Sequence, residues 1–141
     1  MIDSMLAASA AQRERRILLS VPGLPIDLTC VTLDKRTVER CQQSAERLYG
    51  RKPGLWNWHL CASLIGNATQ EIEFNGVRLE DEDGDPITFG MCARFGVTEM
   101  VEAVGKTLGR DGNVVALGRA LLDESGYDRE GNPVVEEADP S

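Results

Sequence analysis

The chain has 141 residues, with 15 Lys and Arg against 23 Asp and Glu, which gives a formal net charge of −8. A chain of this length forms one ordinary domain and buries enough surface to fold without disulfides or a metal. Its acidity argues against a general nucleic-acid binder, which needs a dense basic surface. No segment approaches the about 20 apolar residues that span a bilayer, and none has the layout of a secretory signal. We therefore expect a soluble, intracellular protein.

The negative charge is concentrated in two short segments. Residues 71–85 and residues 123–141 each contain seven acidic residues and one arginine, a net charge of −6 per segment. The remaining residues carry thirteen basic and nine acidic side chains, a net charge of +4. Because unpaired charge is most stable in water, we expect a solvated loop and a solvated tail on a mildly basic body.

The N-terminal part of the chain predicts an arm followed by a β-hairpin. Residues 1–16 are rich in alanine and form either a short helix or a frayed arm, which propensity alone does not decide. Residues 17–21 are an apolar run of β type, and residues 26–33 alternate between the two faces of a strand. Residues 22–25, PGLP, form the turn between them, because proline fixes φ and removes a hydrogen-bond donor.

An amphipathic helix is expected next. Asp34 can cap it, Tyr49 is its last residue, and Gly50 can end it in a left-handed conformation. Spacings of three and four place its apolar residues on one face: Val38, Cys41, Ala45 and Leu48.

Residues 55–65 are apolar nearly all round, which indicates a helix that is central to the core or buried against a partner. We expect Gly66 and Asn67 to end this helix. Trp56 and Trp58 are two of the seven aromatic residues and diverge around the helix. Both tryptophans can lie in the core, or one can anchor an interface; the sequence leaves both interpretations open.

The C-terminal half predicts a second hairpin and two more helices. Asn75-Gly76 is the strongest short-range signal for a two-residue hairpin turn, and residues 81–86 form another turn. We expect Thr98 to cap a helix that ends at Gly109, and Asn113 to cap the last helix. The apolar positions of the last helix are Val114, Leu117, Leu121 and Leu122, and it is expected to end at Ser125-Gly126.

These elements predict a predominantly helical α+β domain with an N-terminal β-hairpin and a second small hairpin. Residues 1–16 form the N-terminal helix or arm, residues 17–126 the globular domain, and residues 127–141 a flexible, disordered acidic tail.

The chemical motifs do not assemble into a catalytic, cofactor or metal site. The four cysteines show no CxxC spacing, and His59 is the only histidine. Cys61 lies about 200° from His59 around a helix, so the two cannot form a local dyad. Residues 105–107, GKT, lack the glycine that a phosphate-binding loop needs five residues earlier. Residues 81–85 do not continue into the glycine and glutamate of a calcium loop.

Three phrases of the sequence, taken in order, point to a family. They are SVPG at residues 20–23, IEFNGV followed by LEDEDGDPI within residues 72–87, and LLDESGYD at residues 121–128. Together they resemble the tail assembly chaperones of long-tailed bacteriophages, over about residues 17–127. The resemblance implies a non-enzymatic factor of the host bacterial cytoplasm, without a cofactor. It would bind the tape measure protein, keep it soluble and help recruit tail tube subunits.

Two other functions remain as alternatives: a structural subunit of the phage tail or neck, and a hydrolase that pairs Cys92 or Cys61 with His59. Homo-oligomerisation stays open, and we expect no membrane partner. An assembly factor needs apolar surface for its client. The candidate partner-binding residues are Trp56, Trp58, Leu117, Leu121, Leu122 and Tyr127.

Overall fold

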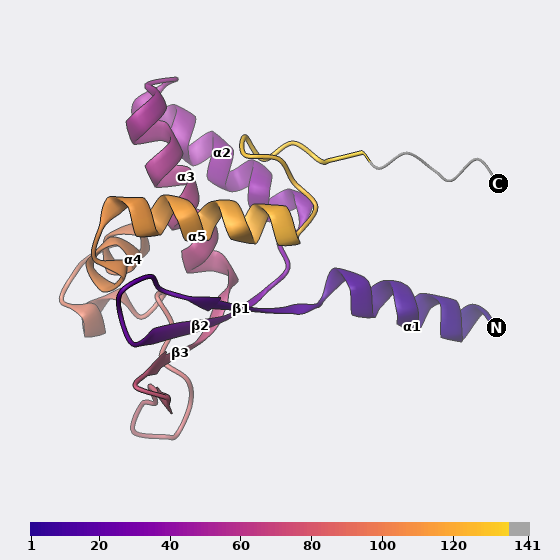
Figure 1. Ribbon diagram of the computed structural model, residues 1–141, viewed down its shortest axis with the longest axis horizontal. Helices are drawn as coiled ribbons and strands as arrows, with labels where there is room; N and C mark the ends of the chain where they lie inside the picture. The colour runs from indigo at the N-terminus through magenta and orange to yellow at the C-terminus, as the bar shows by residue number, and fades with distance from the viewer. Residues whose placement is uncertain (136–141) are drawn as a thin grey trace.

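The computed structural model describes residues 1–135 and has a mixed α+β architecture, with helices packed over one face of an antiparallel sheet (Figure 1). Its helices are α1 (Ile2–Arg13), α2 (Lys35–Tyr49), α3 (Pro53–Ala68), α4 (Met100–Leu108) and α5 (Asp111–Glu124), with a 3-10 turn η1 (Cys92–Phe95). Its strands are β1 (Arg16–Ser20), β2 (Ile26–Val31), β3 (Thr69–Phe74) and β4 (Val77–Arg78). The predicted fold class is confirmed.

The four strands form one antiparallel sheet in chain order, β1-β2-β3-β4. Ile17 pairs with Cys30 and Leu28 pairs with Ile72, and all four side chains are buried. Successive side chains of a strand point to opposite faces, so Leu18 points away from the core and is 69% exposed. One face of the sheet therefore contributes to the core, and the opposite face of β1 is exposed.

Helix α3 is central and packs against α2, α4, α5 and β2. Residues 60–65 are all buried, which explains an apolar sequence around the whole helix. The prediction that Gly66 and Asn67 end this helix is wrong, because α3 continues to Ala68 and β3 follows at once. A Cβ on Gly66 would lie 2.8 Å from the side chain of Met100. Gly66 therefore allows α3 and α4 to pack closely and does not terminate a helix.

Helix α2 confirms its predicted ends. The backbone N–H of Thr37 donates to the Asp34 carboxylate at 2.7 Å, and Gly50 ends the helix with a φ of 59°. Leu48 was expected on the apolar face, but it is 59% exposed and does not pack against the core. The buried residues of this helix are Val38, Cys41 and Ala45.

The predicted caps of the last two helices are wrong. The N-cap of α4 is Glu99, without a capping side chain, so Thr98 lies outside the helix. Asn113 lies within the first turn of α5. Its side-chain amide donates to the carbonyls of Leu108 at 2.9 Å and Pro22 at 3.2 Å. Asn113 therefore joins the α4–α5 turn to the first hairpin.

The predicted turns are confirmed. Asn75 and Gly76 have φ values of 53° and 78°, the left-handed pair that a two-residue hairpin turn needs. The backbone N–H of Asp81 donates to the carbonyl of Asp85 at 2.9 Å and closes the acidic turn.

The predicted start of the tail at Tyr127 is too early. Tyr127 forms an antiparallel bridge with Pro133, and the side-chain amide of Gln42 donates to the Glu130 carbonyl at 2.6 Å. Gly131 is buried against α2, where a Cβ would come within 2.5 Å of Gln42. Residues 127–133 therefore form a turn that packs on α2. Residues 136–141 of the predicted tail lie outside the described residues.

Candidate interaction surface

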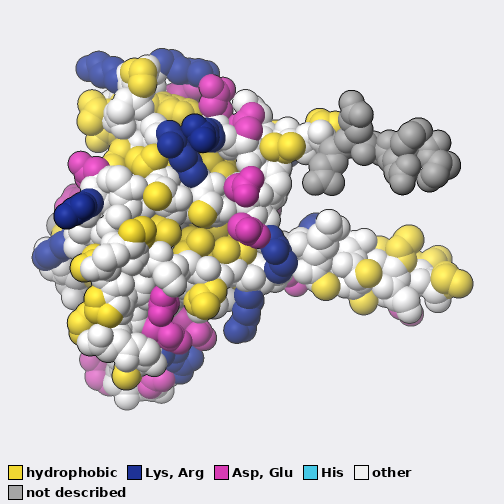
Figure 2. All heavy atoms as spheres, in the orientation of Figure 1, with side chains coloured by type: hydrophobic (Ala, Val, Ile, Leu, Met, Phe, Trp, Pro, Cys, Tyr) yellow, Lys and Arg dark blue, Asp and Glu magenta, His cyan; other side chains and the backbone are white. Residues whose placement is uncertain are grey.

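Helix α1, which we call the arm, extends away from the body of the molecule, and none of its residues is buried (Figure 1). Ile2, Met5 and Leu6 are 68%, 59% and 54% exposed. Figure 2 shows apolar side chains along the arm, separated from the apolar surface of the body. The sequence left a helix or a frayed arm open for this segment, and the structure has a projecting helix.

The local sequence explains why the arm is helical. Its alanines favour a helix, and Asp3 in the first turn and Arg13 in the last turn complement the helix dipole. A helix of 12 residues is nevertheless marginal in water unless an apolar face is packed. The apolar residues of the arm are not covered by any other part of the chain. Exposed apolar residues of this kind are typical of an interaction surface.

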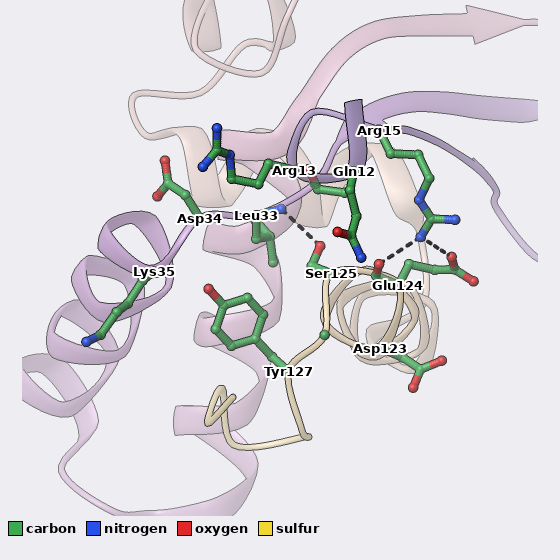
Figure 3. A pocket seen from close by; sticks show the side chains of 12 residues that line it. Gln12, Arg13, Arg15, Leu33, Asp34, Lys35, Asp123, Glu124, Ser125 and Tyr127 are labelled. Carbon is green, nitrogen blue, oxygen red and sulfur yellow. Dashed lines mark hydrogen bonds and ion pairs between the residues drawn. The ribbon is translucent and has the colours of Figure 1, made fainter. Parts of the chain in front are cut away.

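A hollow of about 700 Å³ lies where the arm joins the body, and we call it the basal hollow (Figure 3). Its walls come from the end of the arm, the β2–α2 connection and the end of α5. The guanidinium of Arg15 donates to the Glu124 carboxylate at 2.6 Å and to its carbonyl at 2.8 Å. The backbone N–H of Leu33 donates to the Ser125 hydroxyl at 2.9 Å and joins the other two walls.

Charges of both signs line the basal hollow: Arg13, Arg15, Lys35, Asp34, Asp123 and Glu124. Hydrogen bonds from Thr37 hold the pKa of Asp34 below its ordinary value, so this carboxylate stays ionised. Burial, and then the charges of Asp34 and Glu39, raise the pKa of Tyr127. Tyr127 therefore offers a neutral hydroxyl to the hollow.

The structure places some of the predicted partner-binding residues in the core and leaves others half-buried. Leu117, Leu121 and Leu122 are at most 5% exposed, so their prediction as partner-binding residues is wrong. They line the inner face of α5, where it packs on α3, and form part of the core. Tyr127 lines the basal hollow and is half-buried.

Trp56 and Trp58 are half-buried and pack against the core from the first half of α3. The guanidinium carbon of Arg51 lies 6.0 Å from the Trp56 ring centroid, a cation–π distance. Trp58 packs against Gly105 of α4, where a Cβ would come within 2.9 Å of its ring. Neither indole N–H has a hydrogen-bond partner in the described chain, and both are shielded from solvent. The two tryptophans mainly close the edge of the core.

His59 is 6% exposed, and its Nε2 lies 3.2 Å from the Ser44 hydroxyl. Burial lowers its pKa, and the charge of Glu99 raises it in part. The sequence did not identify Ser44, because α2 and α3 must be packed before the two residues meet.

Neither Cys61 nor Cys92 is placed to act as a nucleophile with His59. The Cys61 thiol is directed to the Val115 carbonyl at 3.8 Å, and burial raises its pKa to about 11. A thiol with such a pKa carries almost no thiolate at neutral pH. Cys92 lies in η1 and shares no hydrogen bond with His59 in the described residues. The pairing that the hydrolase alternative requires is therefore not formed.

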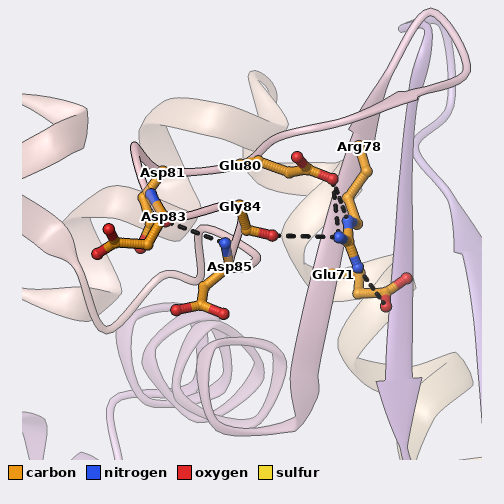
Figure 4. A network of polar contacts seen from close by, with 7 residues as sticks. All are labelled: Glu71, Arg78, Glu80, Asp81, Asp83, Gly84 and Asp85. Atoms are coloured by element: carbon orange, nitrogen blue, oxygen red, sulfur yellow. Dashed lines mark hydrogen bonds and ion pairs between the residues drawn. The ribbon is translucent and has the colours of Figure 1, made fainter.

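The acidic segment of residues 71–85 is an ordered polar network (Figure 4). The Arg78 guanidinium lies 2.7 Å from the Glu80 carboxylate and 3.4 Å from that of Glu71. The Asp81 carboxylate accepts hydrogen bonds from backbone N–H groups of its own turn. Across residues 1–135, no group of three or more His, Cys, Asp or Glu side chains could hold a metal ion.

Comparison of the chain with protein-family models, curated proteins and solved structures found no match. Within residues 1–135, every helix is too short or too polar to cross a membrane.

Proposed function

We propose that this protein is a tail assembly chaperone of a long-tailed bacteriophage, which binds the tape measure protein in the host bacterial cytoplasm and helps recruit tail tube subunits. The ordered phrases in residues 20–23, 72–87 and 121–128 suggest the family. The observation that carries the proposal is the arm, because a chaperone that holds a client needs apolar surface that its own chain does not cover.

The arm fits an elongated, apolar client. Ile2, Met5 and Leu6 form its most apolar part, and the alanines that follow leave space for a client helix to approach closely. The net charge of −8 keeps the empty protein soluble and disfavours self-aggregation. The binding residues are therefore those of the arm, in place of the buried leucines of α5.

Co-expression with the tape measure protein tests this role. We expect the protein to raise the soluble fraction of the client, and Leu6→Glu to abolish most of that effect. Removing one buried leucine contact costs about 2–3 kcal/mol, which weakens binding by roughly 30- to 150-fold. The measurement is the amount of client in the supernatant after centrifugation.

Leu48→Glu is the matched control, because Leu48 is an exposed leucine on the surface of α2, outside the arm. We expect the Leu48 variant to raise the soluble fraction of the client as much as the wild type does. The proposal fails if the client is equally soluble without this protein, or if the Leu6 and Leu48 variants behave alike.

A further inference from the structure

One face of the arm is marked by Ile2, Leu6, Ser9 and Arg13, which recur at spacings of four, three and four. Of the eight other residues of the arm, four are alanine and one is the exposed Met5. A helix of 12 residues is about 18 Å long, and on this face Ile2 and Leu6 lie in its first half, whereas Ser9 and Arg13 lie in its second half. A partner helix with the same sequence that runs in the opposite direction would place Leu6 against the small Ser9 and Ile2 against Arg13.

The charges of the arm also favour an antiparallel second copy. Asp3 is its only acidic residue and lies at one end, whereas Arg13 lies about 15 Å away at the other end. Two parallel arms would bring Asp3 against Asp3 and Arg13 against Arg13. Two antiparallel arms bring Asp3 of each copy to Arg13 of the other, at both ends of the contact.

We infer that two copies of this protein associate through their arms, which pair antiparallel about a two-fold axis between Ala7 and Ala8. Leu6 then faces Ser9 of the second copy, and Ile2 packs on the aliphatic part of Arg13 of the second copy. The interface is isologous, so each contact occurs twice.

The basal hollow fits the end of such a pair. In this register, Met1 of one copy passes the end of the other copy's arm and reaches the hollow of about 700 Å³ at its base. Asp3 then lies near Arg13 of the second copy, at the rim of that hollow. The side chain of Tyr127, directed into this space in Figure 3, offers Met1 an apolar ring.

Charge reversal with rescue tests the pairing in the full-length protein. Sedimentation velocity over a concentration series should show a monomer–dimer equilibrium for the wild type. Asp3→Arg and Arg13→Asp each place like charges together at both ends of the contact, and each should weaken the dimer by at least about tenfold. The double variant D3R/R13D restores opposite charges and should restore the dimer.

Arg110→Asp is the control, because it makes the same charge change as Arg13→Asp at an exposed position outside the arm, in the connection between α4 and α5. Figure 1 shows this connection at the end of the body away from the arm. The Arg110 variant should associate as the wild type does. Circular dichroism of each variant checks that the exposed substitutions leave the fold unchanged.

A protein that stays monomeric at all concentrations would overturn the inference. A dimer that the single reversals leave unchanged, or that the double variant does not restore, would overturn it equally. The pairing concerns the empty protein and stands without the proposed function. Its failure would appear in sedimentation, whereas failure of the chaperone role would appear only in the solubility of the client.

Discussion

His59, the only histidine of the chain, is almost completely buried. It lies between α2 and α3, beside the Ser44 hydroxyl and the edge of the Tyr49 ring, whose centroid is 5.6 Å away. Glu99 also faces it and partly offsets the effect of burial on its pKa. A buried imidazole of this kind is held in its neutral form.

We expect the free energy of unfolding to fall as the pH is lowered through the range below about 6.5. Burial lowers the pKa of His59 from its ordinary value of 6.5 in the folded state, so the unfolded chain binds the proton more readily. The stability that neutral His59 contributes is fully present above the pKa that His59 has in the unfolded chain. It is lost as the pH falls through the pKa of His59 in the folded protein. Urea unfolding at several pH values between 7.5 and 5.5 measures this dependence.

Two variants isolate the effect of His59 from that of other groups. His59→Gln should flatten the pH dependence, since glutamine does not titrate. Glu99→Gln should steepen it, because Glu99 raises the pKa of His59. An unchanged slope in the His59 variant would show that another group is responsible.

At the scale of elements, the closest approach of α3 and α5 depends on Gly118. A Cβ at this position would lie 2.3 Å from Cβ of Cys61 and 2.8 Å from its Cα, so the backbone itself would have to move. Gly118→Ala should therefore lower the free energy of unfolding by about 1–3 kcal/mol or more. Urea or thermal denaturation measures the change.

Gly112→Ala provides the matched control in the same helix. A Cβ on Gly112 meets no atom within 4 Å, so alanine should raise the free energy of unfolding by about 0.5–1 kcal/mol through helix propensity. Equal effects at Gly112 and Gly118 would contradict the close contact between α3 and α5.

Local patterns predicted most elements but not every end. The Asn75-Gly76 turn and the Asp34 cap depend on neighbouring residues, and both were predicted correctly. Gly50 ends a helix as expected, whereas Gly66 continues one. Gly50 has a φ of 59°, whereas Gly66 does not have a positive φ and instead packs against Met100 from a distant part of the chain. Such a contact is not visible in a window of neighbouring residues.

The candidate site was less predictable than the fold. Leu121 and Leu122 have the pattern of an apolar face, but a pattern does not distinguish a face that packs on α3 from one that a partner covers. The arm contains few large apolar residues, so its sequence left a helix and a frayed arm equally open. The arm is exposed because no other element packs against it, and the whole fold determines which elements pack together.

At the scale of the whole molecule, the acidic segment 71–85 lies apart from the apolar residues of the arm, while Asp123 and Glu124 lie at the arm's base. The acidic segment 71–85 is tied to the sheet by Arg78, and Arg94 lies 2.6 Å from Glu82 in the same region. The arm extends from another part of the body, as Figures 1 and 2 show. The separation leaves the arm free to engage a partner while the acidic surface remains in water.

Amide hydrogen exchange of the full-length protein tests most directly whether the arm is free until a partner covers it. In dilute protein we expect residues 2–13 to exchange rapidly, because none is buried, while the amides of α3 remain protected. At high protein concentration, or with the tape measure protein bound, protection should appear in residues 2–13. Arm amides that are already protected in the dilute monomer, or that stay unprotected under both partner conditions, would contradict this role of the arm.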